Sequence, residues 1–451
     1  MKQHSQIHED KISRQSPDGV PDPTMSDTTP KIAVALLDGG GDKPYTFGLA
    51  TELISQGATL DLIGNDALDL PEFRNQRGVK FFNLRGDQRT DASFLRKVFR
   101  VSMYYIRLIR YAATAKPTLF HILWNNKFES LDRTFLMLYY RLLGKRVVLT
   151  AHNVNAARRD SQDTFLNRLT LRIQYRLANH IFVHTEKMKL ELAKAFGVQG
   201  TPITVIPFGI NNAVPNTDIT PVEARKRLGI QDDKKVILFF GRIAPYKGIE
   251  FLITAFQQVL ARHDDYRLVI AGRPEKYCET YWSSIQEQIR ENVQRGRILL
   301  RAEFIPDEET ELYFKAADAL VLPYKDIFQS GVLFLGYSFG LPVIAADVGS
   351  LKDEIVEGKT GFAFQREDPT DLAKALERYF ASDLFANLAS RRQEISEYAR
   401  ERHSWELVGQ MTMDVYAGLL RVPSPRQLSY REAPESSVDM KSPSRTRQCQ
   451  S

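Results

Sequence analysis

Cysteine is scarce in this chain of 451 residues, which contains two, Cys278 and Cys449. Two cysteines exclude a disulfide framework and indicate a reducing compartment. Long apolar runs are missing as well: none approaches the roughly 18 residues of a membrane-spanning helix, and residues 1–30 lack the apolar segment of a signal peptide. We therefore expect a cytoplasmic protein, either free or attached peripherally to the inner face of the cell membrane.

A strong charge of one sign is also absent, because the net charge is +6 and the pI about 9.0. This mildly basic balance suits a phosphate-rich substrate or an anionic membrane surface as well as it suits nucleic acid. The balance alone does not support a nucleic-acid partner, and we predict none.

Strands and helices alternate in two successive series, which predicts an α/β protein with two doubly wound, mostly parallel sheets. Open sheets of this kind place ligands at the carboxyl ends of their strands, here in a cleft between two domains. We expect disordered tails at 1–30 and 422–451, an amino-terminal domain at 31–215, a carboxyl-terminal domain at 216–403, and a closing helix at 404–421 that can return to the first domain.

The stretch Tyr324–Leu351 is typical of a phosphate-binding turn between a strand and a helix. A buried strand ends at Pro323, and Gln329-Ser330-Gly331 opens a helix that ends at Gly340. The free N–H groups and the dipole at a helix start attract an anion, and small residues let it come close.

The loop Gly241–Gly248 follows the first strand of the second series. Gly241 lets backbone pass near a ligand, while Arg242 and Lys247 can meet two phosphates, Arg in bidentate fashion and Lys as a point charge. The alternative is a surface loop with two solvated cations.

Further motifs occur in a fixed order: Ile206-Pro-Phe-Gly-Ile-Asn211, Ala271-Gly-Arg273, Phe304–Glu309, Gly340–Ala345 and Gly358-Lys-Thr-Gly-Phe362. Together with the two loops above, this set resembles glycosyltransferase family 4, retaining enzymes with two facing Rossmann-like domains (the GT-B fold). The resemblance covers residues 31–420 and is most specific from Phe240 to Phe364. Leu123-Trp124 and Thr150–Val154 look like the subgroup that builds lipid-linked polysaccharide units.

The resemblance implies roles for individual residues. Arg242 and Lys247 would stabilise the departing diphosphate, and His152 would lie near the transferred sugar, so these three form the catalytic set. The implied donor site comprises Gly241, Arg273, Phe304, Ile305, Asp326, Gln329, Ser330, Gly331 and Val332, with Phe304 and Ile305 beside the nucleobase. The implied loop of the first domain comprises Gly39, Gly40, Gly41 and Asn153.

One departure concerns two glutamates, eight positions apart, that the family typically carries around the phosphate turn. Ile327 and Leu335 occupy those places here, and neither side chain accepts a hydrogen bond. Asp326 or Gln329 is expected to substitute for the first glutamate.

We predict no metal and no cofactor, since the nucleotide sugar is a substrate. The other main glycosyltransferase fold holds a divalent ion with two aspartates spaced D-x-D, and no two aspartates of this chain have that spacing.

The helix expected at 93–113 invites a membrane interpretation, because at about 100° per residue its arginines share one sector. Tyr104 and Tyr111 border that sector, a placement suited to lipid headgroups or to an acceptor's diphosphate. The alternative is a core-packed helix with a solvated basic face. The candidate membrane contacts are Arg96, Arg100, Arg107 and Arg110.

These observations favour a metal-independent, retaining hexosyltransferase that moves a sugar from a nucleoside-diphosphate sugar to a hydroxyl acceptor, a saccharide or lipid-linked saccharide of polysaccharide biosynthesis. A non-catalytic two-domain partner subunit or scaffold remains an alternative because of the missing glutamates. A sugar-nucleotide epimerase is the other alternative.

Overall fold

The computed structural model describes residues 32–423 apart from 41, 75, 88–92, 127, 160–162 and 211–213, with the backbone alone at Phe94. The tail predicted at 1–30 lies outside these residues, as does the tail predicted at 422–451 beyond residue 423.

Seven parallel strands form the first sheet, in the order β3-β2-β1-β4-β5-β6-β7. Alternate residues of β1 face opposite sides of it, so that Ala35 and Leu37 enter one apolar cluster while Val34 and Leu36 enter another. The strands are β1 (Ala33–Asp38), β2 (Thr59–Gly64), β3 (Val79–Asn83), β4 (Leu119–Trp124), β5 (Arg146–Thr150), β6 (His180–Val183) and β7 (Ile203–Val205).

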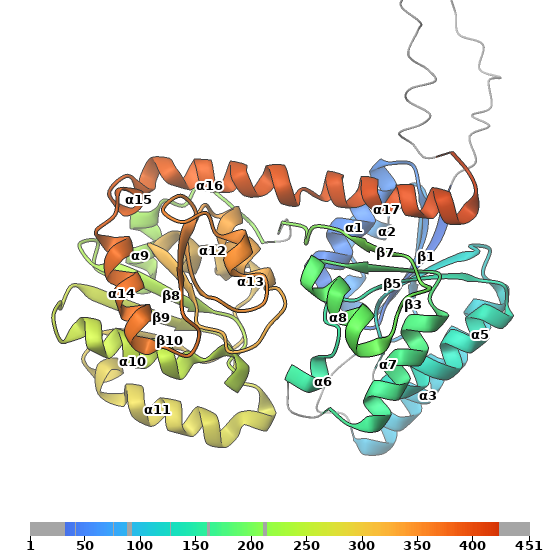
Figure 1. The fold of residues 1–451 in the computed structure, drawn as a ribbon, viewed down its shortest axis with the longest axis horizontal. Coiled ribbons are helices and arrows are strands. Elements are labelled where there is room, and N and C mark those ends of the chain that lie inside the picture. Colours follow the sequence, from blue (N-terminus) through green and yellow to red (C-terminus); the bar gives the residue numbers. More distant parts are fainter. Residues whose placement is uncertain are drawn as a thin grey trace, which may run out of the picture. The chain divides into compact units, whose positions relative to one another are not determined.

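Helices cover both faces of this sheet, and Figure 1 shows α3, α5 and α7 on one side with α1 and α17 on the other. Thr185 caps α8 by accepting a hydrogen bond from the Met188 amide at 3.1 Å. The bounds are α1 (Lys43–Ser55), α2 (Pro71–Arg74), α3 (Phe94–Thr114), α4 (Glu129–Leu131), the π-helical turn η2 (Asp132–Leu136), α5 (Met137–Leu142), α6 (Ala156–Arg159), α7 (Phe165–Leu177) and α8 (Glu186–Phe196).

Six parallel strands form the second sheet, in the order β10-β9-β8-β11-β12-β13. Its last strand begins at Gly361, inside the motif Gly358-Lys-Thr-Gly-Phe362. The strands are β8 (Lys235–Phe240), β9 (Tyr266–Ala271), β10 (Ile298–Arg301), β11 (Ala319–Leu322), β12 (Val343–Ala346) and β13 (Gly361–Phe364); the helices are α9 (Pro221–Leu228), α10 (Ile249–Leu260), α11 (Glu279–Gln294), α12 (Asp307–Ala316), α13 (Gly331–Ser338), α14 (Pro369–Phe380), α15 (Asp383–Ala386) and α16 (Leu388–His403).

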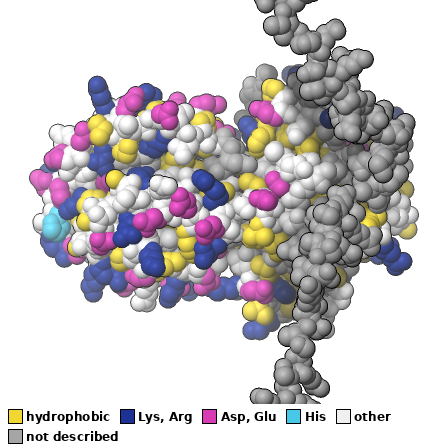
Figure 2. Space-filling view, turned by 90° about the horizontal axis from the view of Figure 1, so that it is seen from above, with side chains coloured by type: hydrophobic (Ala, Val, Ile, Leu, Met, Phe, Trp, Pro, Cys, Tyr) yellow, Lys and Arg dark blue, Asp and Glu magenta, His cyan; other side chains and the backbone are white. Residues whose placement is uncertain are grey.

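The predicted α/β class with two doubly wound parallel sheets is confirmed. On the face drawn in Figure 2, the surface of the carboxyl-terminal domain carries Lys and Arg mixed with Asp and Glu, without a continuous area of either sign. Mixed charge of this kind is ordinary for a protein surface and points to no partner there.

The last helix, α17 (Trp405–Leu420), packs with α1 and the first sheet. Trp405 donates a hydrogen bond from Nε1 to the carbonyl of Ile210, at 2.7 Å. Its indole lies against Gly48 of α1 and against Gly209, where an added Cβ would fall 2.1 and 2.4 Å from ring atoms. Tyr416 extends the contact, because its hydroxyl lies 2.5 Å from Nδ1 of His121 inside the first sheet.

Candidate active site

The loop after β8 brings a buried cation to the carboxyl end of the second sheet. Gly241 has a φ of 102°, and the turn η3 (Pro245–Lys247) follows. Lys247 is 6% exposed, and its Nζ lies 3.8 Å from the centre of the Tyr324 ring. Burial lowers the pKa of Lys247 well below its ordinary value, and the charges of Arg242 and Arg159 lower it further.

No carboxylate among the described residues lies within ion-pair distance of the Lys247 ammonium. Arg242 differs, since its side chain is 75% exposed and its Nη1 pairs with Glu275 Oε1 at 3.1 Å. A buried ammonium that faces a cavity without a carboxylate partner is a strong site for an anion.

The phosphate-type turn lies beside this lysine. Ser330 is buried, and its hydroxyl donates to the Tyr324 hydroxyl at 3.4 Å, so both Lys247 and Ser330 contact Tyr324. Its side chain makes no capping hydrogen bond to α13, which leaves the first amides of that helix to a ligand. The parallel order of β8 and β11 accounts for this meeting, because both loops leave the same edge of the sheet.

The loop after β8 and the turn before α13 both line a cavity of about 430 Å³. The sequence-predicted residues that line it are Gly241, Arg242, Lys247, Phe304, Ile305, Gln329, Ser330, Gly331 and Val332. Residues that the sequence did not indicate also line it, among them Asp42, Tyr45, Phe208, Tyr246 and Trp405. The cavity is therefore shared by the first domain, the second domain and the start of α17.

Asp42 shows how the first domain reaches this cavity. It caps α1 by accepting from the Tyr45 amide at 3.4 Å. Burial raises the pKa of its carboxyl, while the nearby charge of Arg242 opposes that change. One feature of the sequence could have indicated that this segment reaches the cavity: Asp42-Lys43-Pro44, a typical start of a helix, directly follows the glycine loop.

Other predicted residues lie outside the cavity. Arg273 and Asp326 are exposed and do not line it. Gly39 lies against the backbone of Asn125, which an added Cβ would meet at 2.1 Å, so close backbone approach explains this glycine. Gly40 lines a separate cavity, and Gly41 is outside the described residues.

Comparison with known families gives a consistent result for both domains. Residues 39–214 match the model described as Glycosyltransferase Family 4, and residues 222–402 match the model described as Glycosyl transferases group 1. The chain belongs to this glycosyltransferase family. It is a retaining glycosyltransferase that uses a nucleotide-sugar donor.

Individual relatives of this glycosyltransferase are distant. An uncharacterised glycosyltransferase of Methanocaldococcus jannaschii is 24% identical over 392 residues, which span 84% of this chain and 94% of that one. The structure of sucrose-phosphate synthase from Thermosynechococcus elongatus superposes with a TM-score of 0.70 at 18% identity, covering 87% of this chain and all of that one. An Anabaena protein crystallised with UDP-glucose has a TM-score of 0.64 at 17% identity, covering 86% and 99%. These structures show that this glycosyltransferase has the GT-B fold.

The missing glutamate pair leaves an apolar patch in the wall of the donor cavity. Ile327 and Leu335 both line the cavity and are 9% exposed. Gln329 lies between them in sequence, and its Nε2 donates to Glu354 Oε1 at 3.3 Å. Its Oε1 is buried and has no partner among the described residues, so it is an unused hydrogen-bond acceptor between the two apolar positions.

His152 lies behind this cavity and does not line it. Its ring stacks on Trp124 with centres 4.0 Å apart and meets the edge of Tyr45, a cavity residue, at 4.5 Å. Its Nδ1 lies 3.0 Å from His184 Nε2, and His184 Nδ1 lies 3.3 Å from the Ile206 carbonyl.

These contacts determine the protonation of both rings, because a carbonyl oxygen can only accept. His184 must therefore donate from Nδ1 and accept at Nε2, and His152 donates from Nδ1. Burial lowers the pKa of His184 to about 4 and that of His152 well below its ordinary range. The Nε2 of His152 is then a bare acceptor, buried and without a partner among the described residues.

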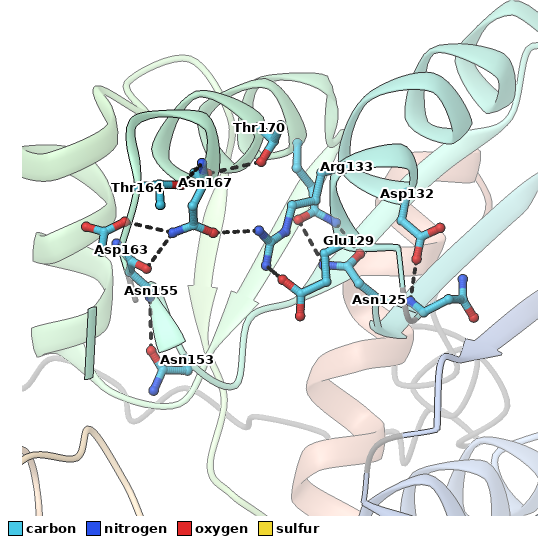
Figure 3. Close-up of polar contacts among 12 residues, drawn as sticks. Asn125, Glu129, Asp132, Arg133, Asn153, Asn155, Asp163, Thr164, Asn167 and Thr170 are labelled. Carbon is cyan, nitrogen blue, oxygen red and sulfur yellow. Dashed lines mark hydrogen bonds and ion pairs between the residues drawn. The ribbon is translucent and has the colours of Figure 1, made fainter. Parts of the chain in front are cut away.

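Polar side chains fix the loop that carries Asn153 (Figure 3). Asn153 accepts from the Asn155 amide at 2.9 Å, and Asn155 accepts from Asn167 Nδ2 at 3.0 Å. Asn167 in turn accepts from Arg133 at 2.8 Å. Figure 3 shows Asp132, the neighbour of Arg133 in η2, pointing the other way, toward the turn after β4. The Asn153 side chain therefore holds its own loop and is not part of the cavity lining.

The arginines of α3 have unequal surroundings. Arg96, Arg107 and Arg110 are exposed, whereas Arg100 is half-buried. Of the two tyrosines expected to border the basic face, Tyr104 lines a recess together with Lys97 and Arg100. Both are buried and bonded, Tyr104 to Asn126 and Tyr111 to Asp61 at 2.8 Å, because the sheet takes up this side of the helix.

Proposed function

We propose that the cavity holds the diphosphate of a nucleoside-diphosphate sugar between Lys247, Arg242 and the first amides of α13. The observation that carries the proposal is the buried Lys247 ammonium, which lacks a carboxylate partner in the described chain and lies on the same tyrosine as the phosphate-type turn. Phe304 and Ile305 line the same cavity and offer apolar surface to the nucleobase.

In the reaction proposed here, the bond between the sugar's anomeric carbon and the diphosphate oxygen breaks, and a bond to the acceptor oxygen forms on the same face. The acceptor's proton passes to a donor phosphate oxygen. Lys247 and Arg242 stabilise the negative charge that grows on the departing diphosphate, and the low dielectric around the buried Lys247 strengthens the effect of that residue. His152 does not line the cavity, and we assign it to positioning Tyr45, the cavity residue whose ring it meets.

The donor is expected to be a UDP sugar, because the Anabaena protein of the same fold was crystallised with UDP-glucose. A hexose is the sugar, and the acceptor is a saccharide or lipid-linked saccharide of polysaccharide biosynthesis. This acceptor assignment rests on the motifs Leu123-Trp124 and Thr150–Val154.

Thermal unfolding with UDP, GDP and ADP tests the proposal, since a ligand of the native state raises its melting temperature. One nucleotide is expected to raise it at a concentration far below that of the other two, and Lys247→Ala should remove the shift. Lys276→Ala, an exposed lysine outside the cavity, is the matched control and should keep it. No shift with any nucleotide in folded wild-type protein would contradict the proposal.

The scaffold alternative makes the opposite prediction for function. If the protein only holds partners together, Arg242→Ala and Lys247→Ala leave the cellular phenotype unchanged, whereas the enzyme proposal requires its loss. An epimerase would convert the donor's sugar without any acceptor, and sugar analysis of the recovered nucleotide sugar distinguishes that outcome.

Contact with an anionic membrane through α3 also stays a proposal. No described helix is long and apolar enough to cross a bilayer. The observation in favour of surface contact is that large apolar residues are exposed beside the arginines of α3: Leu95, Val98, Phe99, Ile106 and Ile109. Sedimentation with phosphatidylglycerol vesicles, compared with neutral vesicles, tests it.

A further inference from the structure

A second group of cations lies in the amino-terminal domain, on elements that do not form the donor cavity. Arg85 follows β3, Lys97 and Arg100 belong to α3, and Asn126 follows β4. These residues line one small recess together with Val101, Tyr104 and Tyr105. Three separate segments of the chain therefore direct polar groups to one place.

A wider cavity of about 610 Å³ adjoins the recess, because Arg85 and Arg100 line both. It adds Arg96 and Arg107, and the carboxylate among its lining residues is Asp87. In the described part of the chain, Arg96, Arg100 and Arg107 have no carboxylate within 4.0 Å. Guanidinium groups from several directions match the oxygens of phosphate better than they match a single carboxylate.

Buried hydrogen bonds hold the wall of this recess. The Tyr104 hydroxyl donates to Asn126 Oδ1, and Asp132 accepts from both the Asn126 amide and the Tyr105 hydroxyl, the latter at 2.9 Å. Arg85 donates to the carbonyl of Gly39 at the end of β1. Arg85, Tyr104 and Asn126 are thus positioned by the fold before a ligand binds, which lowers the entropic cost of binding.

The recess also leads toward the donor cavity. A third cavity, of about 500 Å³, shares Arg85 with the recess and is lined on its other side by Gly40 and Lys43. Asp42, between those two residues in sequence, lines the donor cavity. The third cavity and the donor cavity are therefore lined by adjacent residues of the same loop, Lys43 and Asp42.

We infer that this recess, with Arg85, Lys97 and Arg100 as its cations, binds a phosphate or pyrophosphate group of the acceptor. The acceptor is then a phosphorylated saccharide, and its anionic end is held in the first domain while its hydroxyl faces the donor sugar. The assignment to the acceptor rests on the proposed function, whereas the affinity of the recess for a phosphate does not.

Titration calorimetry with inorganic pyrophosphate separates the two sites. Wild-type protein is expected to bind two equivalents, one beside Lys247 and one in the recess. Lys247→Ala should lose the first, and Lys97→Gln/Arg100→Gln should weaken the second at least tenfold. The matched control Arg141→Gln/Arg146→Gln removes the same charge from exposed residues outside these cavities and should bind both. Unchanged melting temperatures confirm that the variants fold.

Equal affinity for the second equivalent in wild type and Lys97→Gln/Arg100→Gln would overturn the inference. A failure of the proposed function looks different, because nucleotides would then cause no thermal shift while the recess still binds pyrophosphate. Glucose 1-phosphate and phosphatidylglycerol vesicles distinguish the source of the phosphate. Binding of the soluble sugar phosphate that the double variant loses supports an acceptor site. Binding of vesicles alone would assign these cations to a membrane surface and overturn the acceptor site.

Discussion

The two domains bury their apolar residues to different degrees. In the carboxyl-terminal domain a single cluster surrounds the six strands, and few large apolar side chains are exposed, Tyr277 and Phe304 among them. The amino-terminal domain instead exposes large apolar residues on three helices of one face: Leu95, Phe99 and Ile106 on α3, Leu138 and Leu142 on α5, and Phe165 and Leu166 on α7.

This difference corresponds to a division of labour. The donor is a small charged molecule, and in the proposed function the carboxyl-terminal domain binds it with Lys247, Arg242 and the turn at Ser330. The apolar face and the cationic recess of the first domain are surfaces of a kind that marks contact with a larger partner. This contrast supports our proposal that the amino-terminal domain recognises the acceptor.

The largest effect is expected from substitution of the buried Lys247, which tests the proposed donor site of the carboxyl-terminal domain. Lys247→Ala is expected to lower kcat/KM at least about 100-fold, or roughly 3 kcal/mol, because a charge-assisted contact to the leaving group is lost in a low-dielectric site. Steady-state kinetics of nucleotide release checks it. Activity within threefold of wild type would place the diphosphate elsewhere, and Lys276→Ala controls for the loss of a surface charge.

Two glycines test the junction of the first domain with α17. Gly48→Ala puts a Cβ against the Trp405 ring and is expected to cost about 1–3 kcal/mol of unfolding free energy. Gly418→Ala, in α17 with no heavy atom within 4 Å of its Cβ, should instead stabilise by about 0.5–1 kcal/mol. Chemical denaturation measures both, and equal effects would mean that Trp405 is not held as described.

Acid should weaken the first domain before the second. Burial lowers the pKa of His121 to about 3 and those of His180 and His184 to about 4, all in the first domain. Between about pH 6.5 and pH 4 the unfolded chain binds protons that these folded histidines do not, so stability falls as pH falls, by up to about 1.4 kcal/mol per pH unit for each. Asp42 and Asp132 act in the opposite direction, because burial raises the pKa of both carboxyls, that of Asp132 to about 6. They are two carboxyls against four histidines, since burial also lowers the pKa of His152.

Hydrogen exchange at pH 7 and pH 5 measures this difference between the domains. Amides of β4–β6 should lose protection at the lower pH more than those of β8–β12. Equal loss in both sheets would contradict the assignment of acid sensitivity to the buried histidines.

The smallest effect is expected on the apolar face. Leu142 is 85% exposed, so Leu142→Ser should change the unfolding free energy by no more than about 0.5 kcal/mol. Denaturant melts check this expectation. A loss above about 2 kcal/mol would show that the face is covered in the folded protein and would remove the contrast between the domains.

Much of this organisation could be predicted from the sequence. The alternation of apolar strands and amphipathic helices predicted both sheets. The positions of Lys247 and Ser330, each in a loop after a strand, predicted that the two residues lie close together, because adjacent parallel strands end at the same edge of a sheet. The wall formed by Tyr45, Phe208 and Trp405 could not be predicted, since it depends on contacts between residues as far apart as Gly48 and Trp405. The burial of His152 under Trp124 also depends on a contact between residues distant in sequence. Arg273 and Asp326 show a different limit, because the composition of a loop does not determine which way its side chains point.

The return of α17 to the first sheet has a consequence for synthesis. A ribosome makes the chain from its amino terminus, so β1 to β7 are complete long before Trp405 and Tyr416 emerge. Until then the surfaces around Gly48 of α1 and around Gly209 stay uncovered, and His121 lacks its hydrogen bond to Tyr416. The first half of this enzyme must therefore wait for the last helix, and shortening the protein at its far end should impair the maturation of its beginning.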